Sequence, residues 1–214
     1  MSKTIILSIV IAISLISCKI GGIKGNGNEI TENRELGSFE KIDVSGNFDV
    51  IVESSNNQDV DVISETNLID HIKTVVKKNT LFIYSQENLR PTKEMLISIK
   101  LPKLVGINCS GANNVTAKDI QSKDFNIDLS GAGSVKIDGK SINTFIDLSG
   151  AADLIAKDFI SENVNVDISG AANAQVYAVN SIKADISGAG NVELYGEPSN
   201  VTTDISGVGS LERK

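Results

Sequence analysis

The sequence predicts an all-β protein, a right-handed parallel β-solenoid (β-helix) with coils of about 20 residues and an irregular, β-rich N-terminal cap. One observation is a repeated peptide: IDLSGAGSV at 127–135, IDLSGAADL at 146–154, VDISGAANA at 166–174, ADISGAGNV at 184–192 and TDISGVGSL at 203–211. A second is the near-constant spacing of the Ser-Gly pairs, which is 20, 19, 20, 18 and 19 residues from Ser110 to Ser206. The third is apolar and polar alternation with a period of two.

Each repeat has the pattern of two strands and a short third side. Ile127 and Leu129 alternate with Asp128 and Ser130, which is typical of an extended chain with one buried face. A shorter apolar signal closes each unit, and its residues are Ile120, Ile142, Ile160, Ile182 and Val201. Like strands of successive coils should pair in parallel about 4.8 Å apart. The right-handed sense follows from the general rule for parallel crossovers.

The Ser-Gly pairs are predicted to form the corners between the first two sides. We expect their glycines to take backbone dihedrals that strain other residues. These glycines are Gly111, Gly131, Gly150, Gly170, Gly188 and Gly207. A β-sandwich of short antiparallel strands also tolerates a turn every ten residues or so, but it gives no reason for near-identical turns in register.

The N-terminal residues have the features of a bacterial lipoprotein signal. Residues 1–17 combine a charged start, MSK, with an apolar run too short to span a bilayer comfortably, and Cys18 follows in a lipobox-like LISC. Cleavage and acylation would make Cys18 a membrane anchor. Removing Lys3 leaves 19 basic and 27 acidic residues, a net charge of −8. Residues 18–38, rich in Gly and Asn, read as a flexible tether.

Residues 39–214 are predicted to form one domain, with a decorated N-terminal part (39–105) and regular coils (106–214). FEKIDVSGNFDVIV indicates a first coil, VDVISETNLIDHI a strand and a helical turn, VVKKNTLFIYS a hairpin, and EMLISIKLPKL a strand broken at Pro102. Because solenoid ends expose unpaired backbone groups, this part should cap one end. The charged residues 212–214 should blunt the other.

The FEKIDVSGNFDVIV opening, the TLFIYS strand and the iterated IDLSGAG units together resemble the head GIN domain family of auto-transporter adhesins, over roughly residues 39–211. The resemblance implies a β-helical fold and an extracytoplasmic, Gram-negative setting, and with the anchor it points to the outer membrane. It supplies no catalytic residues.

Two polar columns are the candidates for chemistry. The first is acidic and contains Asp128, Asp147, Asp167, Asp185 and Asp204. It is a weak candidate for Ca²⁺, because each coil supplies one carboxylate; backbone hydrogen bonds or hydration beside lysines are favoured. The second column is expected to be structural, through stacked side-chain hydrogen bonds, and contains Asn114, Ser134, Asp153, Asn173, Asn191 and Ser210.

Composition excludes several classes of function. The basic residues are scattered in an acidic chain, which argues against nucleic acid. The chain lacks Trp and has few aromatic residues, so a stacking cleft is not expected. Cys109 is predicted to be a small buried apolar residue, and no disulfide, metal site or cofactor is expected. His71 has no partnered nucleophile, so a solvated loop histidine is favoured.

The resulting hypothesis is a lipid-anchored cell-envelope solenoid acting as a non-catalytic binding, adhesion or structural module. Its partners would be the membrane, through the anchor, and a glycan or protein surface. Two alternatives stay open: a polysaccharide-processing β-helix enzyme that uses aspartates, and an envelope-stress or assembly factor.

Overall fold

The computed structural model describes residues 21–214, so the signal segment 1–17 and Cys18 lie outside the described residues. The described chain is almost entirely β-structure with one short 3-10 helix, η1 (Ile69–His71). The strands are β1 (Ile23–Lys24), β2 (Glu29–Asn33), β3 (Lys41–Gly46), β4 (Asp49–Ser54), β5 (Asp59–Glu65), β6 (Ile72–Lys77), β7 (Thr80–Ser85), β8 (Leu89–Arg90), β9 (Leu96–Leu101), β10 (Gly106–Gly111), β11 (Asn114–Leu129), β12 (Ser134–Leu148), β13 (Asp153–Ile168), β14 (Asn173–Ile186), β15 (Asn191–Tyr195), β16 (Asn200–Ile205) and β17 (Ser210–Arg213).

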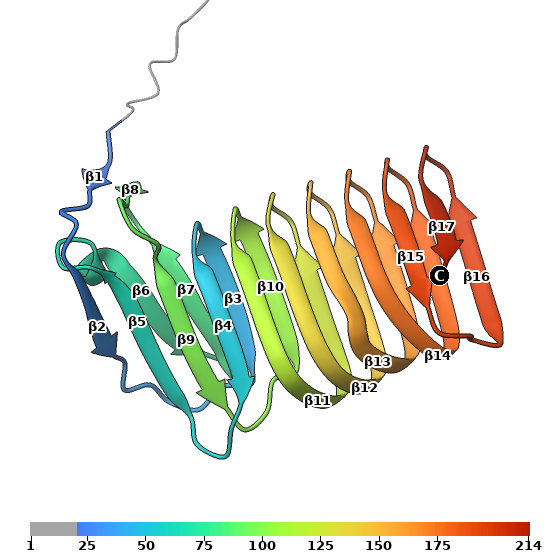
Figure 1. Ribbon diagram of the computed structural model, residues 1–214, viewed down its shortest axis with the longest axis horizontal. Helices are drawn as coiled ribbons and strands as arrows, with labels where there is room; N and C mark the ends of the chain where they lie inside the picture. The colour runs from blue at the N-terminus through green and yellow to red at the C-terminus, as the bar shows by residue number, and fades with distance from the viewer. Residues whose placement is uncertain (1–20) are drawn as a thin grey trace, which may run out of the picture.

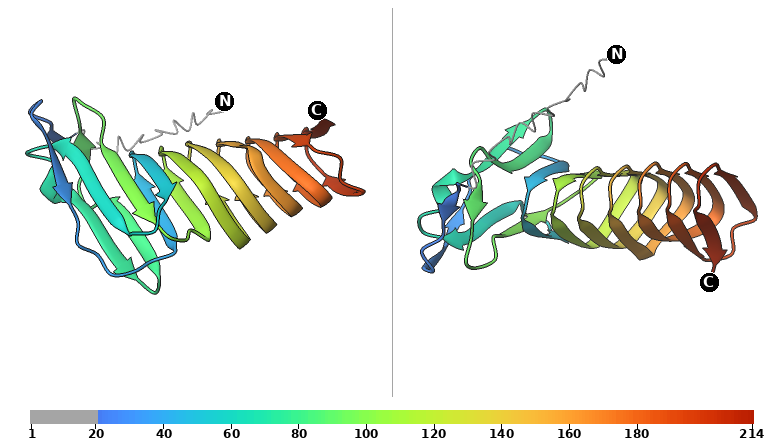
Figure 2. Two further views of the ribbon diagram at one scale, coloured as in Figure 1. Left: turned by 60° about the horizontal axis from the view of Figure 1, so that its bottom comes forward. Right: turned by 90° about the horizontal axis from the view of Figure 1, so that it is seen from above.

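The predicted β-solenoid is confirmed, with about five turns and coils of roughly 20 residues (Figure 1). β11 to β14 each follow one side of a coil, bend, and return along the other side, and successive strands pair in parallel. In β11, residues 114–118 pair with β4 while residues 126–129 pair with β10. Each coil is therefore flattened between two sheet faces, as the views in Figure 2 also show.

The interior is built from stacked columns of alternate residues, and one expected column is wrong at two of its five positions, since Ile120, Ile182 and Val201 do pack into the core. Ile142 and Ile160 are 41% and 40% exposed. The register instead stacks another set on the inside, which is Phe125, Thr144, Val164, Ile182 and Val201. The coils differ by one or two residues, and register shifts at the bend, such as those between Ala117 and Ile120, absorb the difference. These shifts change which residue points inward.

The first coil is interrupted by the cap. β3 pairs with β10, which places Ser45-Gly46 beside Ser110-Gly111, and β4 pairs with β11. The segment between β4 and β10 therefore folds on the other side of the first coil, where β7 extends one sheet and β9 extends the other. The predicted β6–β7 hairpin is confirmed, and Lys78 and Asn79 at its turn have positive φ angles of 48° and 64°.

The predicted flexible tether over 18–38 is wrong where the structure describes it. β1 pairs in parallel with β8, and β2 pairs antiparallel with β5. We call residues 22–33 the N-terminal arm. Polar side chains of the cap hold the arm, because Asn67 Nδ2 donates to the Lys24 carbonyl at 2.8 Å and Asn67 Oδ1 accepts from the Asn26 amide at 3.0 Å. Glycine and asparagine here allow close packing of the arm rather than flexibility.

A buried carboxylate, Glu65, fastens the arm to the cap. Its Oε1 accepts from the Gly27 amide at 2.5 Å and from Thr92 Oγ1 at 2.6 Å, and its Oε2 accepts from the Thr92 amide at 2.8 Å. The Thr92 hydroxyl and these backbone amides lower the pKa of Glu65 from 4.5 to about 2, against the opposing effect of burial. Gly25 crosses this carboxylate so closely that a Cβ would overlap it.

Acid should therefore weaken the attachment of the arm. Because the folded pKa of Glu65 is depressed, its contribution to stability is present above the unfolded pKa and is lost as pH falls from about 5 toward 2. Glu65→Gln should lower the melting temperature at pH 7 and flatten its decline between pH 5 and 2. Differential scanning calorimetry across that range checks this, with exposed Glu35→Gln as the matched control. An unchanged acid slope in Glu65→Gln would contradict the clamp.

No helix in residues 21–214 is long and apolar enough to cross a membrane.

Candidate functional site

The acidic column forms one row on a sheet face of the solenoid. Strand pairing brings the carboxyl-bearing residues of successive coils side by side, and Asp43 and Asn108 extend the series toward the cap. Their apolar neighbours Ile127 and Leu129 are buried, so the row faces outward. We call the following set the acidic row: Asp128, Asp147, Asp167, Asp185 and Asp204.

Asp147 is the residue of the acidic row whose charged form is disfavoured. Partial desolvation, followed by the charges of Asp128 and Asp167, raises the pKa of Asp147 above its usual range. Near the C-terminal end, Lys183 Nζ lies 2.6 Å from Asp185 Oδ2, and this contact raises the pKa of Lys183. Within residues 21–214, the carboxylates of Asp128, Asp147 and Asp167 form no hydrogen bond or ion pair with another residue. Their oxygens are free to accept hydrogen bonds from a ligand.

The acidic row does not assemble a metal site in the part of the chain that the structure describes. No three His, Cys, Asp or Glu side chains there converge in a way that could hold a metal ion. Each coil supplies one carboxylate, and successive strands keep these groups side by side rather than around a common point.

An exposed aromatic ring interrupts the column of polar residues beside the acidic row. Phe145 is 44% exposed and pairs in register with Asn126 on one side and Asn165 on the other. It borders two hollows of about 340 Å³ each. One hollow is lined by Asn108, Asn126, Ile127, Asp128, Phe145, Ile146, Asp147, Asn165 and Asp167. An aromatic ring, amides and carboxylates thus share one open, rigid surface.

Sequence reasoning missed this aromatic position because it weighed only how few aromatic residues the chain has. The alternation in TFIDL does place Phe145 and Asp147 on the same side, opposite Ile146. We call Asn126, Phe145, Asn165 and the adjacent Asp128, Asp147 and Asp167 the Phe145 surface.

A larger hollow of about 620 Å³ lies against the cap. It is lined by Glu29, Asn47, Asp49, Pro91, Thr92, Lys93, Glu94 and Met95. It has no aromatic side chain and is formed partly by the loop that Glu65 holds in place. These residues do not continue from coil to coil, so the Phe145 surface is the better candidate for an extended ligand.

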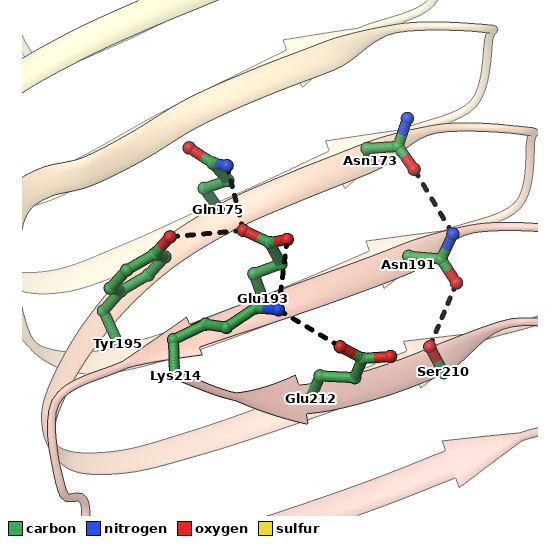
Figure 3. Close-up of polar contacts among 8 residues, drawn as sticks. All are labelled: Asn173, Gln175, Asn191, Glu193, Tyr195, Ser210, Glu212 and Lys214. Atoms are coloured by element: carbon green, nitrogen blue, oxygen red, sulfur yellow. Dashed lines mark hydrogen bonds and ion pairs between the residues drawn. The ribbon is translucent and has the colours of Figure 1, made fainter.

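The second polar column links coils on the opposite face. Asn173 Nδ2 donates to Asp153 Oδ1 at 3.0 Å, Asn191 Nδ2 to Asn173 Oδ1 at 3.4 Å, and Ser210 Oγ to Asn191 Oδ1 at 3.0 Å. Figure 3 shows the last part of this ladder. These four side chains are one another's partners, as expected for a structural column. Asn114 Nδ2 instead donates to Asp49 Oδ1 at 2.8 Å, and the Ser134 side chain has no hydrogen bond within residues 21–214. The structure adds a further ladder, Asp124, Asn143, Asn163 and Ser181, at 2.7 to 3.1 Å.

Contacts between side chains also hold the charged C-terminal residues. Glu193 Oε2 accepts from Gln175 Nε2 at 2.9 Å and from Tyr195 Oη at 3.2 Å, while Lys214 Nζ lies 3.6 Å from Glu193 Oε1 (Figure 3). Glu212 Oε2, 3.2 Å from the same ammonium, is the main cause of the raised pKa of Lys214, and Glu193 adds to it. This network joins β14, β15 and β17, and its side chains stabilise the contacts between these strands.

The corner glycines lie where the sequence predicts. The expected reason for glycine, a backbone dihedral that strains other residues, holds for only one of the six. Of that set, Gly111 has a positive φ (97°). At all six, however, a Cβ would lie closer than 3.0 Å to the carbonyl oxygen of the glycine in the preceding coil, which for Gly111 is Gly46. Glycine is required mainly because the corners of successive coils lie in backbone contact.

The remaining cysteine has the expected environment. Cys109 is 7% exposed. Burial, and to a lesser extent Asp43 and Asp128, raises the pKa of its thiol to about 12. The thiolate needed for nucleophilic chemistry is therefore strongly disfavoured.

Residues 38–198 match the model of the family described as "Putative auto-transporter adhesin, head GIN domain". The chain belongs to this family. The GIN-domain fold is shared with a "putative adhesin" from Bacteroides fragilis, at 23% identity, TM-score 0.77, and coverage of 90% of this chain and 100% of the other.

Two further solved structures resemble it. A "putative adhesin" from Parabacteroides merdae has 18% identity, a TM-score of 0.56 and coverage of 90% and 98%. A "putative lipid binding protein" from Parabacteroides distasonis has 22% identity, a TM-score of 0.53 and coverage of 90% and 99%. At these identities the likeness concerns the fold. No curated protein matches the chain significantly.

Proposed function

We propose that the protein is a non-catalytic binding module of the cell envelope that contacts glycan through the Phe145 surface. One observation carries the proposal: on a rigid sheet, an exposed aromatic ring lies beside the amides of Asn126 and Asn165 and beside carboxylates that have no side-chain partner within residues 21–214. Carboxylate and amide oxygens accept hydrogen bonds from sugar hydroxyls, and an aromatic ring packs against the apolar face of a pyranose. Because three carboxylates border the ring, neutral sugars fit better than anionic ones.

The proposal includes a lipid anchor at Cys18 after removal of residues 1–17, and an outer-membrane location. The order of charged start, apolar run and lipobox-like cysteine supports it. Mass spectrometry of the protein from membranes should find an acylated Cys18 as the first residue. Cys18→Ser should move the protein into the soluble fraction.

A polysaccharide-processing enzyme is the second candidate, because the pKa of Asp147 is raised, as is the pKa of a carboxyl group that acts as a general acid in glycoside hydrolysis. Its neighbours Asp128 and Asp167, however, lie on an open face, and no long loop encloses them. Turnover of a glycan that disappears in Asp147→Asn would favour this candidate over the binding module.

Phe145→Ala should remove most of the glycan affinity. Loss of a central aromatic contact costs about 2 kcal/mol, or roughly thirtyfold in Kd. Glycan-array binding followed by calorimetry with the best neutral oligosaccharide measures the change. Phe145→Tyr should retain binding, and Ile160→Ala, an exposed apolar side chain at the bend, is the matched control. Equal binding by Phe145→Ala and the unmodified protein would exclude this surface.

A further inference from the structure

We propose that the N-terminal arm docks the β1–β8 end of the cap against an anionic phospholipid surface and so fixes the orientation of the solenoid. This inference rests on the lipid anchor at Cys18 proposed above. It concerns which surface meets the membrane, and is independent of the ligand of the Phe145 surface.

The first step is the length of chain available between the anchor and the folded domain. A tether over residues 18–38 could extend about 70 Å. The folded arm begins with β1 at Ile23, only five residue steps from Cys18, and five steps span at most about 18 Å. An acyl chain on Cys18 would therefore keep β1 close to the lipid headgroups.

The second step is that the arm is fixed along its length. The Ile23 amide donates to the Asn88 carbonyl at 2.9 Å, and the Gly25 amide donates to the Arg90 carbonyl at 3.0 Å. Gly22 packs against the same strand, since a Cβ there would lie 2.6 Å from the Asn88 carbonyl oxygen. Glu65 and the pairing of β2 with β5 then continue the attachment. The chain therefore joins the domain at the β1–β8 end of the cap.

The third step is charge. Residues 21–28 and 88–93 together carry three basic residues, Lys24, Arg90 and Lys93, and no acidic residue, in a chain of net charge −7; Glu29, Glu87 and Glu94 flank the two segments. Lys24 and Arg90 are exposed and pair in register across β1 and β8. Neither they nor Lys93 forms an ion pair within residues 21–214. Basic side chains near an anionic leaflet are attracted to it, whereas the acidic row would be repelled.

Together these features place the cap at the membrane and the C-terminal coils away from it. β1 and β8 lie at the cap end of the long axis, opposite β16 and β17 (Figure 1). The Phe145 surface lies on the intervening coils, which would project from the bilayer.

The test uses the mature protein, which begins at acylated Cys18, in vesicles of phosphatidylethanolamine and phosphatidylglycerol. The vesicles also contain a lipid with a nitroxide headgroup. Gln86→Cys, next to β8, and Thr202→Cys, on β16, each offer one exposed thiol for a fluorophore, because Cys109 is buried. Quenching at position 86 should exceed that at position 202 by about threefold or more, since only position 86 lies within reach of the short anchor. Equal quenching in vesicle-bound protein would overturn the orientation.

Two further variants separate the causes. A sixteen-residue Gly-Ser insertion between Gly21 and Gly22 should keep the protein on vesicles but abolish the difference between the two positions. Lys24→Glu with Arg90→Glu should reduce quenching at position 86 in anionic vesicles and leave it unchanged in phosphatidylcholine vesicles; no change in anionic vesicles would overturn the charge contribution. Unacylated Cys18→Ser protein that binds the vesicles as tightly as the acylated protein would instead refute the anchor itself.

Discussion

Gly150→Val should destabilise the solenoid by about 3 kcal/mol or more and lower the melting temperature by roughly 6–12 °C. A Cβ at Gly150 would lie closer than 3.0 Å to the Gly131 carbonyl oxygen. That oxygen accepts a hydrogen bond from the Ala151 amide at 3.0 Å, and it belongs to backbone clamped between coils. Relief of the overlap would require separating two coils that pair along almost their entire length. Thermal unfolding followed by circular dichroism measures the loss.

Two controls identify coil contact as the cause. Ala151→Ser changes the exposed neighbouring corner position and should alter stability by about 0.5 kcal/mol or less. Gly207→Ala makes a similar overlap with the Gly188 carbonyl, but in the last described coil, where β16 and β17 have a paired neighbour on one side. It should cost less than Gly150→Ala. Equal effects at Gly150, Ala151 and Gly207 would show that coil contact is not the reason for glycine.

The coil unit could be predicted from sequence because its two strongest constraints are periodic. Strand alternation identifies Ile127 and Leu129 as interior, and the fixed spacing places the Ser-Gly corners in register. The first coil could also be predicted, since IDVSG at 42–46 has the same alternation and Ser-Gly pair as the later repeats. These predictions depend on local pattern alone.

The predictions were wrong where contacts between residues distant in sequence determine the structure. Whether Ile142 or Thr144 points inward depends on a bulge that compensates for unequal coil lengths, and no local pattern fixes its position. The arm looked flexible because Gly25 and Gly27 have high conformational freedom, yet Glu65, distant in sequence, supplies the hydrogen bond that orders them. The acidic row could be predicted as a column, whereas the structure was needed to show that the carboxylates of Asp128, Asp147 and Asp167 have no partner within residues 21–214.

The interior has a second vulnerable point, the aromatic pair Phe125 and Phe159. Their ring centroids lie 5.3 Å apart with an interplanar angle of 61°, an edge-to-face arrangement. The rings belong to β11 and β13, so they meet across the intervening strand β12. In β12, Thr144 pairs in register with Phe125 and Gly139 pairs in register with Phe159. Because one of these residues is small and the other has no side chain, they leave space for the rings.

Phe159→Ala should therefore cost about 3–5 kcal/mol, because the intervening coil has no large side chain that could fill the cavity. Phe159→Leu should cost less, and Ile160→Ala, its exposed neighbour, should have little effect. Urea unfolding of the single variants and of Phe125→Leu with Phe159→Leu gives the coupling energy, which should be about 0.5–1.5 kcal/mol for an edge-to-face pair. Additive losses would mean that the two rings stabilise their coils independently. A measurable coupling would show that β11 and β13 are joined through the space left by β12, so that three coils lose stability together.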